Sequence, residues 1–290
     1  MDPQNLPIVV TDSASQLVQA DVLPFGIEVV PLEIYINGKE YLDGLEITPG
    51  ELYKKMRTEN PEVKTSAPGV GRFYSVFKKM IDQGRNEILC ITISNKLSAT
   101  YNAAVDAANM IQAEYSEKKV IVFDSLTAAV AQGFLALEAA KRLSTGESME
   151  KVIRFLTLAR ERTGLIAAVE TLKYLAQGGR IGKASYLVGN ALRIVPVLTV
   201  NREGVVAPVA KVRRKDNLLP NMLSILNQHI KGWKKIHLSV MHADAMEQAK
   251  GLQKALSDLY PSLEVPIEPF TPVMGAHTGP GLFGMGYYFE

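Results

Sequence analysis

The chain has 290 residues and a formal net charge of +2, from 32 basic and 30 acidic side chains. This length predicts about two domains, each large enough to bury a core, and the balanced charge argues against nucleic-acid binding as the main activity. A single cysteine excludes an internal disulfide framework. No apolar run approaches the ~18 residues of a membrane span, and residues 1–7 lack the layout of a secretion signal. We therefore expect a cytoplasmic protein.

The first part of the chain alternates short apolar runs with helical spacing, the pattern of a parallel sheet with helical crossovers. Asn37-Gly38 predicts a tight hairpin, and residues 64–69 are predicted as a polar turn. Strands are predicted at 8–11, 23–30, 32–36, 39–42, 88–93 and 120–123, and helices at 49–56, 73–81, 98–109, 128–143 and 149–162. These elements predict an α/β domain over residues 1–160, with a parallel sheet and helices on both faces.

From residue 164 onward, strands and helices are mixed, and one strand pair is joined by a glycine-containing hairpin loop at 201–204. Strands are predicted at 165–169, 195–200, 205–212, 236–241 and 265–270, and helices at 172–176, 218–230 and 245–259. This pattern predicts a second domain, α+β with a mixed sheet, over residues 161–290. The glycine-rich tail contains GPGLFG at 279–284, which we reject as a dinucleotide fingerprint because it includes a proline and leaves no room for a following helix.

The turn after the strand at 88–93 carries two serines, Ser94 and Ser98. Ligands of open α/β sheets bind beyond the carboxyl ends of the strands. Ser98 is also placed to cap the next helix, where backbone N–H groups lack intrahelical partners. Two interpretations stay open: the two serines hold an anionic ligand group, or Ser98 only caps its helix.

Three further segments are candidates for a functional role. His277 precedes Thr278-Gly-Pro-Gly, where glycines let the backbone approach a ligand closely, and a hydrolase that pairs His277 with Ser98 or Ser125 is conceivable. Arg180 lies in a glycine-rich turn, which indicates either a helix C-terminal cap with an exposed charge or a functional cation. The basic run at 211–215 indicates a solvated surface or a docking patch.

Together these pieces resemble the DegV family of bacterial fatty-acid-binding proteins over essentially the whole chain. The resemblance is carried by the segments 8–13, 65–68 (TSAP), 97–101 (LSATY), 124–125 (DS), 178–182 (GGRIG) and 277–281 (HTGPG). Two positions depart from the family pattern, Gly69 in place of serine and Ala99 in place of glycine. Both departures leave the hydroxyls of Thr65 and Ser98 in place.

The resemblance implies two α/β domains with one fatty acid buried in a tunnel, its carboxylate at the domain interface. Thr65 and Ser98 would bond the carboxylate, with Ser66, Ser94 and His277 nearby. Some family members carry the acyl chain for a fatty acid kinase, a separate ATP-binding protein that phosphorylates the carboxylate. Arg180 and Arg213 resemble positions used to dock that partner.

From the residues and the resemblance, we expect a lipid-binding protein that is at most a non-catalytic kinase subunit. The sequence offers no Walker loop, nucleophile elbow or metal-ligand spacing, so we expect no metal and no cofactor besides the bound acid. The alternatives are a hydrolase built on Ser98 and His277, and a regulatory module that binds a small phosphorylated ligand.

Overall fold

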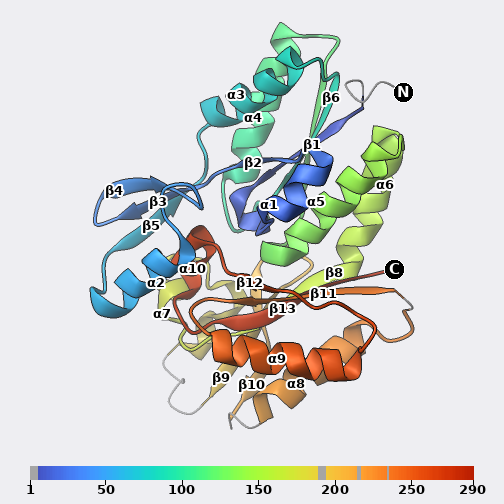
Figure 1. Cartoon of the computed structure of the whole chain (residues 1–290). Helices are drawn as coiled ribbons and strands as arrows, with labels where there is room; N and C mark the ends of the chain where they lie inside the picture. The colour runs from blue at the N-terminus through green and yellow to red at the C-terminus, as the bar shows by residue number, and fades with distance from the viewer. Residues whose placement is uncertain (1–5, 189–193, 214–216, 234) are drawn as a thin grey trace.

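The computed structural model describes residues 6–188, 194–213, 217–233 and 235–290, and these residues form three β-sheets (Figure 1). The first sheet is parallel and has the strand order β2-β1-β6-β7. Its strands are β1 (Ile8–Asp12), β2 (Glu28–Val30), β6 (Glu87–Thr92) and β7 (Lys119–Asp124). The predicted parallel sheet is confirmed.

Helices cover both faces of the parallel sheet because successive strand residues point to opposite sides. Val9 and Leu89 pack against one pair of helices, and Val10 and Cys90 pack against the other pair. The first pair is α5 (Ala129–Ser144) and α6 (Met149–Ala159); the second is α3 (Val70–Asp82) and α4 (Thr100–Glu114). Cys90 is accordingly a core residue.

The second sheet has six strands in the order β10-β9-β8-β13-β11-β12. It is mixed, because only β11 and β12 run parallel. Its strands are β8 (Thr163–Ala168), β9 (Val195–Val200), β10 (Val206–Val212), β11 (Ile236–His242), β12 (Ile267–Pro269) and β13 (Phe283–Phe289). Helices α8 (Leu218–His229) and α9 (Met246–Leu259) pack on one face. The mixed sheet is confirmed, whereas the domain boundary at 160/161 stays a prediction.

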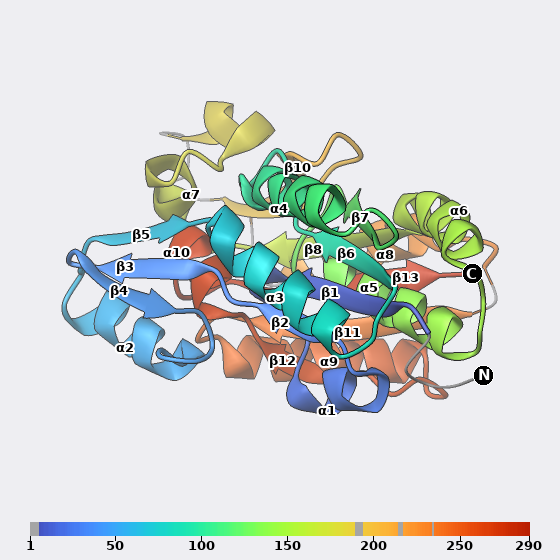
Figure 2. The same ribbon diagram turned by 90° about the horizontal axis from the view of Figure 1, so that it is seen from above.

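A small antiparallel sheet, β4-β3-β5, projects to one side together with α2 (Pro49–Thr58) (Figure 2). Its strands are β3 (Glu33–Ile36), β4 (Lys39–Leu42) and β5 (Val63–Ser66). Asn37 and Gly38 join β3 to β4 with φ of 49° and 81°, so the predicted hairpin is confirmed.

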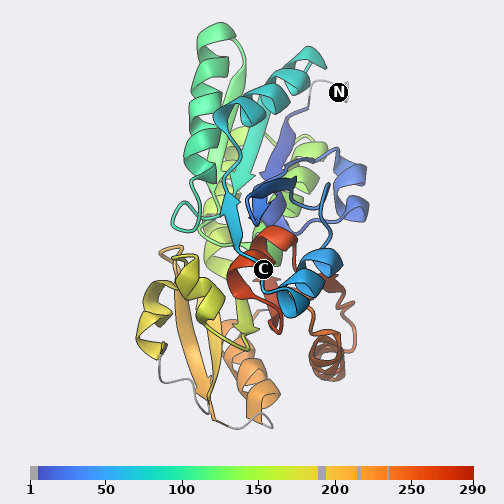
Figure 3. The same cartoon turned by 90° about the vertical axis from the view of Figure 1, so that its left-hand side faces the viewer.

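Helix α10 (Pro272–Thr278) joins the late part of the chain to this small sheet, and lies near the centre of the view in Figure 3. Asp43 accepts a hydrogen bond from Val273 N at 2.9 Å, at the start of α10. The Tyr53 hydroxyl donates to Phe270 O at 2.8 Å. Residues from the first part of the chain therefore hold α10 in place.

Three segments differ from the predictions. Residues 23–25 form a helical turn rather than a strand, and residues 63–66 form β5 rather than a polar turn. The glycine-rich tail contains β13, which pairs with both β8 and β11. Glycine is needed there because a Cβ on Gly286 would lie 2.1 Å from Val130 Cγ2.

The remaining elements are short. They are η2 (Ser13–Ser15), α1 (Gln19–Val22), η3 (Leu23–Phe25), η4 (Arg160–Arg162), α7 (Lys173–Gln177) and η5 (Gly182–Leu187). No helix in the described ranges is both long enough and apolar enough to cross a membrane.

Candidate functional site

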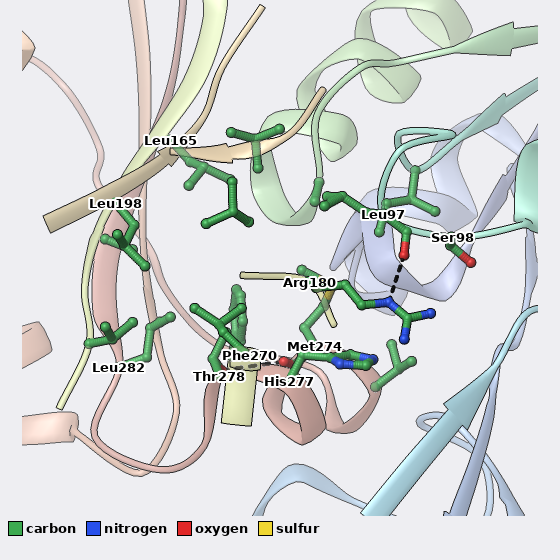
Figure 4. Close-up of a pocket in the computed structure, with 18 of the residues that line it drawn as sticks. Leu97, Ser98, Leu165, Arg180, Leu198, Phe270, Met274, His277, Thr278 and Leu282 are labelled. Carbon is green, nitrogen blue, oxygen red and sulfur yellow. Dashed lines mark hydrogen bonds between the residues drawn. The ribbon is translucent and has the colours of Figure 1, made fainter. Parts of the chain in front are cut away.

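A narrow, mostly apolar cavity lies against the face of the six-stranded sheet that α8 and α9 leave free (Figure 4). Its volume, counted as space open to the centres of water molecules, is about 100 Å³. Apolar side chains from both parts of the chain line it, among them Leu32, Leu97, Leu165, Leu198, Val273 and Met274. No acidic residue belongs to the wall within the described part of the chain, so the cavity suits an apolar chain.

Polar groups gather at one end of the cavity. Thr65 of β5, Ser98 of the turn before α4, Arg180 and His277 of α10 all line it. Figure 4 shows Ser98, Arg180 and His277 on the side opposite Leu165 and Leu198. The cavity therefore has a polar end and an apolar end.

Thr65 and His277 are joined by a hydrogen bond of 2.6 Å between Oγ1 and Nε2. Burial, aided by the nearby Arg180 charge, lowers the pKa of His277 to about 4, so its imidazole is neutral at pH 7. Nδ1 is buried without a hydrogen-bond partner among the described residues. With the proton on Nε2, Thr65 accepts from His277 and its own hydroxyl proton is free to bind an anion.

Arg180 supplies the positive charge at this end. Its Nε donates to Leu97 O at 3.1 Å and its Nη1 donates to Gly178 O at 2.6 Å. The guanidinium thus ties the turn before α4 to the loop after α7. Gly178 lets His277 pack against this loop, because a Cβ there would lie 2.4 Å from Nδ1.

Ser98 is not the helix cap that the sequence indicates. The N-cap of α4 is Ala99. The Ser98 hydroxyl instead accepts from Thr100 N at 3.3 Å and shares a hydrogen bond of 2.8 Å with Thr100 Oγ1. The Ser98 oxygen therefore has its hydrogen-bond partners on Thr100, two residues later in the chain. Ser98 nevertheless lines the cavity.

Two predicted neighbours of the ligand do not line the cavity. Ser66 is exposed and donates to Ala67 O, because in a strand it points away from the side that Thr65 faces. Ser94 is fully buried and donates to Gly204 O at 2.8 Å, which docks the β9–β10 hairpin loop. The structure therefore brings neither serine to the cavity wall.

The two arginines assigned to partner docking lie in different places. Arg180 is half-buried in the cavity wall, whereas Arg213 is exposed at the end of β10 and away from the cavity. The glycine-rich turn around Arg180 indicated a functional cation as one possibility, but not that its side chain lines the cavity. The apolar lining residues were also not identified, because apolar residues that line a pocket and apolar residues that fill a core look the same in the sequence.

A surface cleft lies outside the polar end. It shares Thr65, Arg180 and His277 with the cavity and adds Lys64 and Lys173, with a volume of about 660 Å³. Lys64 is paired with Glu62. A basic cleft therefore adjoins the polar end of the cavity.

The serine–histidine pair of the hydrolase alternative is not assembled. His277 Nε2 is engaged by Thr65, and Ser98 bonds Thr100. Ser125 is fully buried, donates to Thr127 O and does not line the cavity. The described residues also contain no cluster of three or more ligands for a metal.

Comparisons with known proteins agree with this architecture. The chain is 31% identical over 277 residues to a DegV domain-containing protein of Clostridium acetobutylicum, covering 96% of each chain. It is 30% identical to a fatty-acid-binding DegV family protein of Thermus thermophilus, with a TM-score of 0.90 over 98% of this chain and 100% of that one. A stearic acid-binding protein of Eubacterium ventriosum is 26% identical, with a TM-score of 0.89 over 97% of each chain. The family model described as "Uncharacterised protein, DegV family" matches residues 8–290, and the chain therefore belongs to the DegV family.

Proposed function

We propose that this protein binds a long-chain fatty acid, with the acyl chain in the apolar cavity and the carboxylate at its polar end. The observation that carries the proposal is the cavity itself, which is lined mostly by apolar side chains and has Thr65, Ser98, Arg180 and His277 at its polar end. Relatives of known structure that are named for fatty acid binding support it.

The polar end matches a carboxylate in charge and in donors. Thr65 and Ser98 offer hydroxyl donors, neutral His277 orients Thr65, and Arg180 supplies one positive charge. Each charge-assisted hydrogen bond contributes on the order of 1.5–3 kcal/mol. The tail adds roughly 0.8 kcal/mol per buried CH₂, less the cost of ordering the chain. Most of the affinity therefore comes from the acyl chain.

We further propose that the bound acid is presented to a separate ATP-binding kinase. A carboxylate oxygen would attack the γ-phosphate of ATP held by that partner, giving an acyl phosphate and ADP. The basic cleft supports this step, because it adjoins the polar end of the cavity and carries Lys64 and Lys173. Exposed Arg213 fits a docking role, whereas Arg180 is assigned to the carboxylate.

The decisive experiment is extraction of the purified protein with organic solvent and identification of lipids by mass spectrometry. We expect one fatty acid per chain, and uptake of added palmitic acid by delipidated protein. Absence of both would overturn the binding proposal. The kinase step is tested separately by Arg213→Ala, which should impair phosphorylation by the partner and leave the lipid content unchanged; loss of the lipid would contradict the docking role.

A further inference from the structure

The basic cleft beside the cavity holds an excess of positive charge. Among the described residues that line it, Lys64, Lys173 and Arg180 are cationic and Glu62 is the one acid. Three positive charges against one negative charge leave an excess of two. His277 also lines the cleft but adds no charge at pH 7, because burial lowers its pKa to about 4. By its charge, the cleft therefore suits an anion.

Two of these three cations have no carboxylate partner among the described residues. Lys64 Nζ pairs with Glu62 at 2.6 Å. Lys173 Nζ, in contrast, donates its hydrogen bond to the neutral amide oxygen of Asn60, at 3.4 Å. Arg180 donates to two backbone carbonyls, which carry no net charge. The excess positive charge therefore lies on Lys173 and Arg180.

A free carboxylate would match only one of these two cations. Its single negative charge is matched by Arg180 in the proposed function, which leaves Lys173 without an anionic partner. A phosphate monoester carries about −1.5 to −2 charges at pH 7 and has three strong acceptor oxygens. Lysine is a common phosphate ligand in proteins, because its ammonium group is a compact charge with three donors. The two cations together therefore fit a phosphate better than a carboxylate.

The position of the cleft places such a phosphate beside the head of an acyl chain. Thr65, Arg180 and His277 line both the cavity and the cleft. A phosphate joined to the carboxyl end of a chain in the cavity would extend past these shared residues and into the cleft. The cleft has room for it, because its volume of about 660 Å³ compares with about 100 Å³ for the cavity by the same measure.

Lys173 is held loosely enough to turn toward a phosphate in the cleft. It is the first residue of α7 and is exposed. Its hydrogen bond to Asn60 is long, and the four-carbon stem of lysine is flexible. The ammonium group therefore gives up little when it moves from Asn60 to a phosphate oxygen.

We infer that the basic cleft is a binding site for a phosphate group joined to the carboxyl end of the acyl chain, and that Lys173 favours this phosphorylated ligand over the free acid. The ligand class is an acyl phosphate. The inference rests on the proposed function, since it places the acyl chain in the cavity. Arg180 serves both ligands, whereas Lys173 serves the phosphate alone.

The experiment is calorimetric titration of delipidated protein with palmitic acid, inorganic phosphate and hexadecyl phosphate, a stable alkyl phosphate with a chain of the same length. We expect Lys173→Ala to lower the affinity for hexadecyl phosphate about tenfold and to leave palmitic acid within about twofold. Lys173→Arg keeps the charge and should retain most of the affinity. Lys250→Ala is the matched control, because Lys250 is an exposed lysine that pairs with Glu247 outside the cleft.

Phosphorus NMR provides a readout that a purely structural role of Lys173 would not change. The second pKa of a phosphate monoester is about 6, and a nearby cation lowers it by favouring the dianion. The phosphate of bound hexadecyl phosphate should therefore have a lower second pKa in wild-type protein than in Lys173→Ala. Lys250→Ala should match wild type.

An equal effect of Lys173→Ala on palmitic acid and hexadecyl phosphate would overturn the inference, and so would an unchanged second pKa of the bound phosphate. Inorganic phosphate that binds as tightly as hexadecyl phosphate would show a site for free phosphate, and the inference would again be wrong. If wild-type protein binds palmitic acid but not hexadecyl phosphate, the inference fails and the proposed function stands. If it binds neither, the proposed function fails, so the two failures are distinguishable.

Discussion

Thr65 and His277 meet across 212 positions of sequence, and their hydrogen bond sets the chemistry of the polar end. Neither side chain is charged at pH 7, because burial keeps His277 neutral by lowering its pKa to about 4. With the imidazole proton on Nε2, the Thr65 hydroxyl accepts from His277 and keeps its own proton as a donor. Arg180 contributes charge from the side, where its Nε and Nη1 already bond backbone carbonyls. Because these side chains are already held in place by hydrogen bonds, little further ordering of them would be needed for a ligand to bind.

Removing one hydroxyl should weaken binding without unfolding the protein. We expect Thr65→Val or Ser98→Ala to reduce the affinity for palmitic acid by about 1–2 kcal/mol each, because each removes one donor to the carboxylate. Calorimetric titration measures the affinity and thermal unfolding checks the fold. Ser66→Ala is the matched control, since Ser66 is exposed beside Thr65. Unchanged affinity in both site variants would mean that the carboxylate binds elsewhere.

A methyl group at Gly178 should displace His277. The added Cβ would lie 2.4 Å from His277 Nδ1, and relieving such overpacking costs typically 1–3 kcal/mol. We expect Gly178→Ala to weaken palmitic acid binding about tenfold, measured by the same titration. Gly71→Ala on α3, where nothing lies within 4 Å of the new Cβ, is the control. Equal affinities of the two variants would contradict this role.

At the scale of elements, α10 is a short helix fastened at both ends by the first part of the chain. Asp43 bonds its first turn and Thr65 bonds its last. Tyr53 packs against its middle, where a Cβ on Gly275 would lie 2.3 Å from the Tyr53 hydroxyl. The position of His277 therefore depends on the small sheet and on α2 as much as on its own neighbours in sequence.

Asp43 makes this attachment sensitive to pH. Burial raises its pKa from 3.8 to about 7, so the folded protein holds a proton that the unfolded chain releases above pH 4. The free energy of unfolding therefore falls as pH rises from about 4 to 7. Asp12 acts in the same direction, with a pKa raised to about 6, while His277 acts oppositely between pH 6.5 and 4.

We expect Asp43→Asn to remove part of this pH dependence, because an amide oxygen still accepts from Val273 N but does not titrate. Its stability relative to wild type should be higher at pH 8 than at pH 5 by on the order of 2–4 kcal/mol. Denaturant unfolding of both proteins at pH 5 and pH 8 measures this difference in the free energy of unfolding. Any destabilisation by the amide that is the same at both pH values cancels in the comparison. Asp106→Asn, on an exposed surface of α4, is the control. If the free energy of unfolding changes equally between pH 5 and pH 8 in Asp43→Asn and in wild type, the assignment of this pH dependence to Asp43 is wrong.

At the scale of the whole molecule, the cavity lies where the three sheets and their helices meet. Its wall draws on β5, β8, β9, α10 and the turn before α4. A ligand bound there contacts segments that are far apart in sequence. Binding of the proposed ligand should therefore stabilise the chain as a whole.

Removal of the ligand should destabilise the protein. At a free fatty acid concentration of 100 times Kd, binding adds about 2.7 kcal/mol, which for a chain of 290 residues corresponds to a rise in Tm of roughly 4–5 °C. Differential scanning calorimetry of delipidated and palmitic acid-loaded protein measures this shift. Ser98→Ala should show a smaller shift at the same concentration of acid. A Tm that does not respond to acid would argue against the cavity as the binding site.

The sequence predicts the layers of this fold well because its strands are apolar runs of high β-propensity and its helices have clear periodicity. It fails for β13, whose glycines mimic a loop although they serve close packing against α5 and β8. Thr65 and His277 are predicted site residues that the fold brings together. Arg180 and the apolar lining are not predictable as cavity residues, because burial in a wall depends on tertiary packing.

The attachment of α10 also determines what happens when the chain is cut into two fragments. A cut between residues 160 and 161 separates Thr65 and Asp43 from His277 and Val273, so neither fragment carries a whole site. Two such fragments, made separately and each fused to half of a reporter enzyme, would regain a shared binding pocket only on reassociation. The proposed acyl ligand would favour that reunion by bridging both pieces, so the two fragments could be developed into a split-protein lipid sensor.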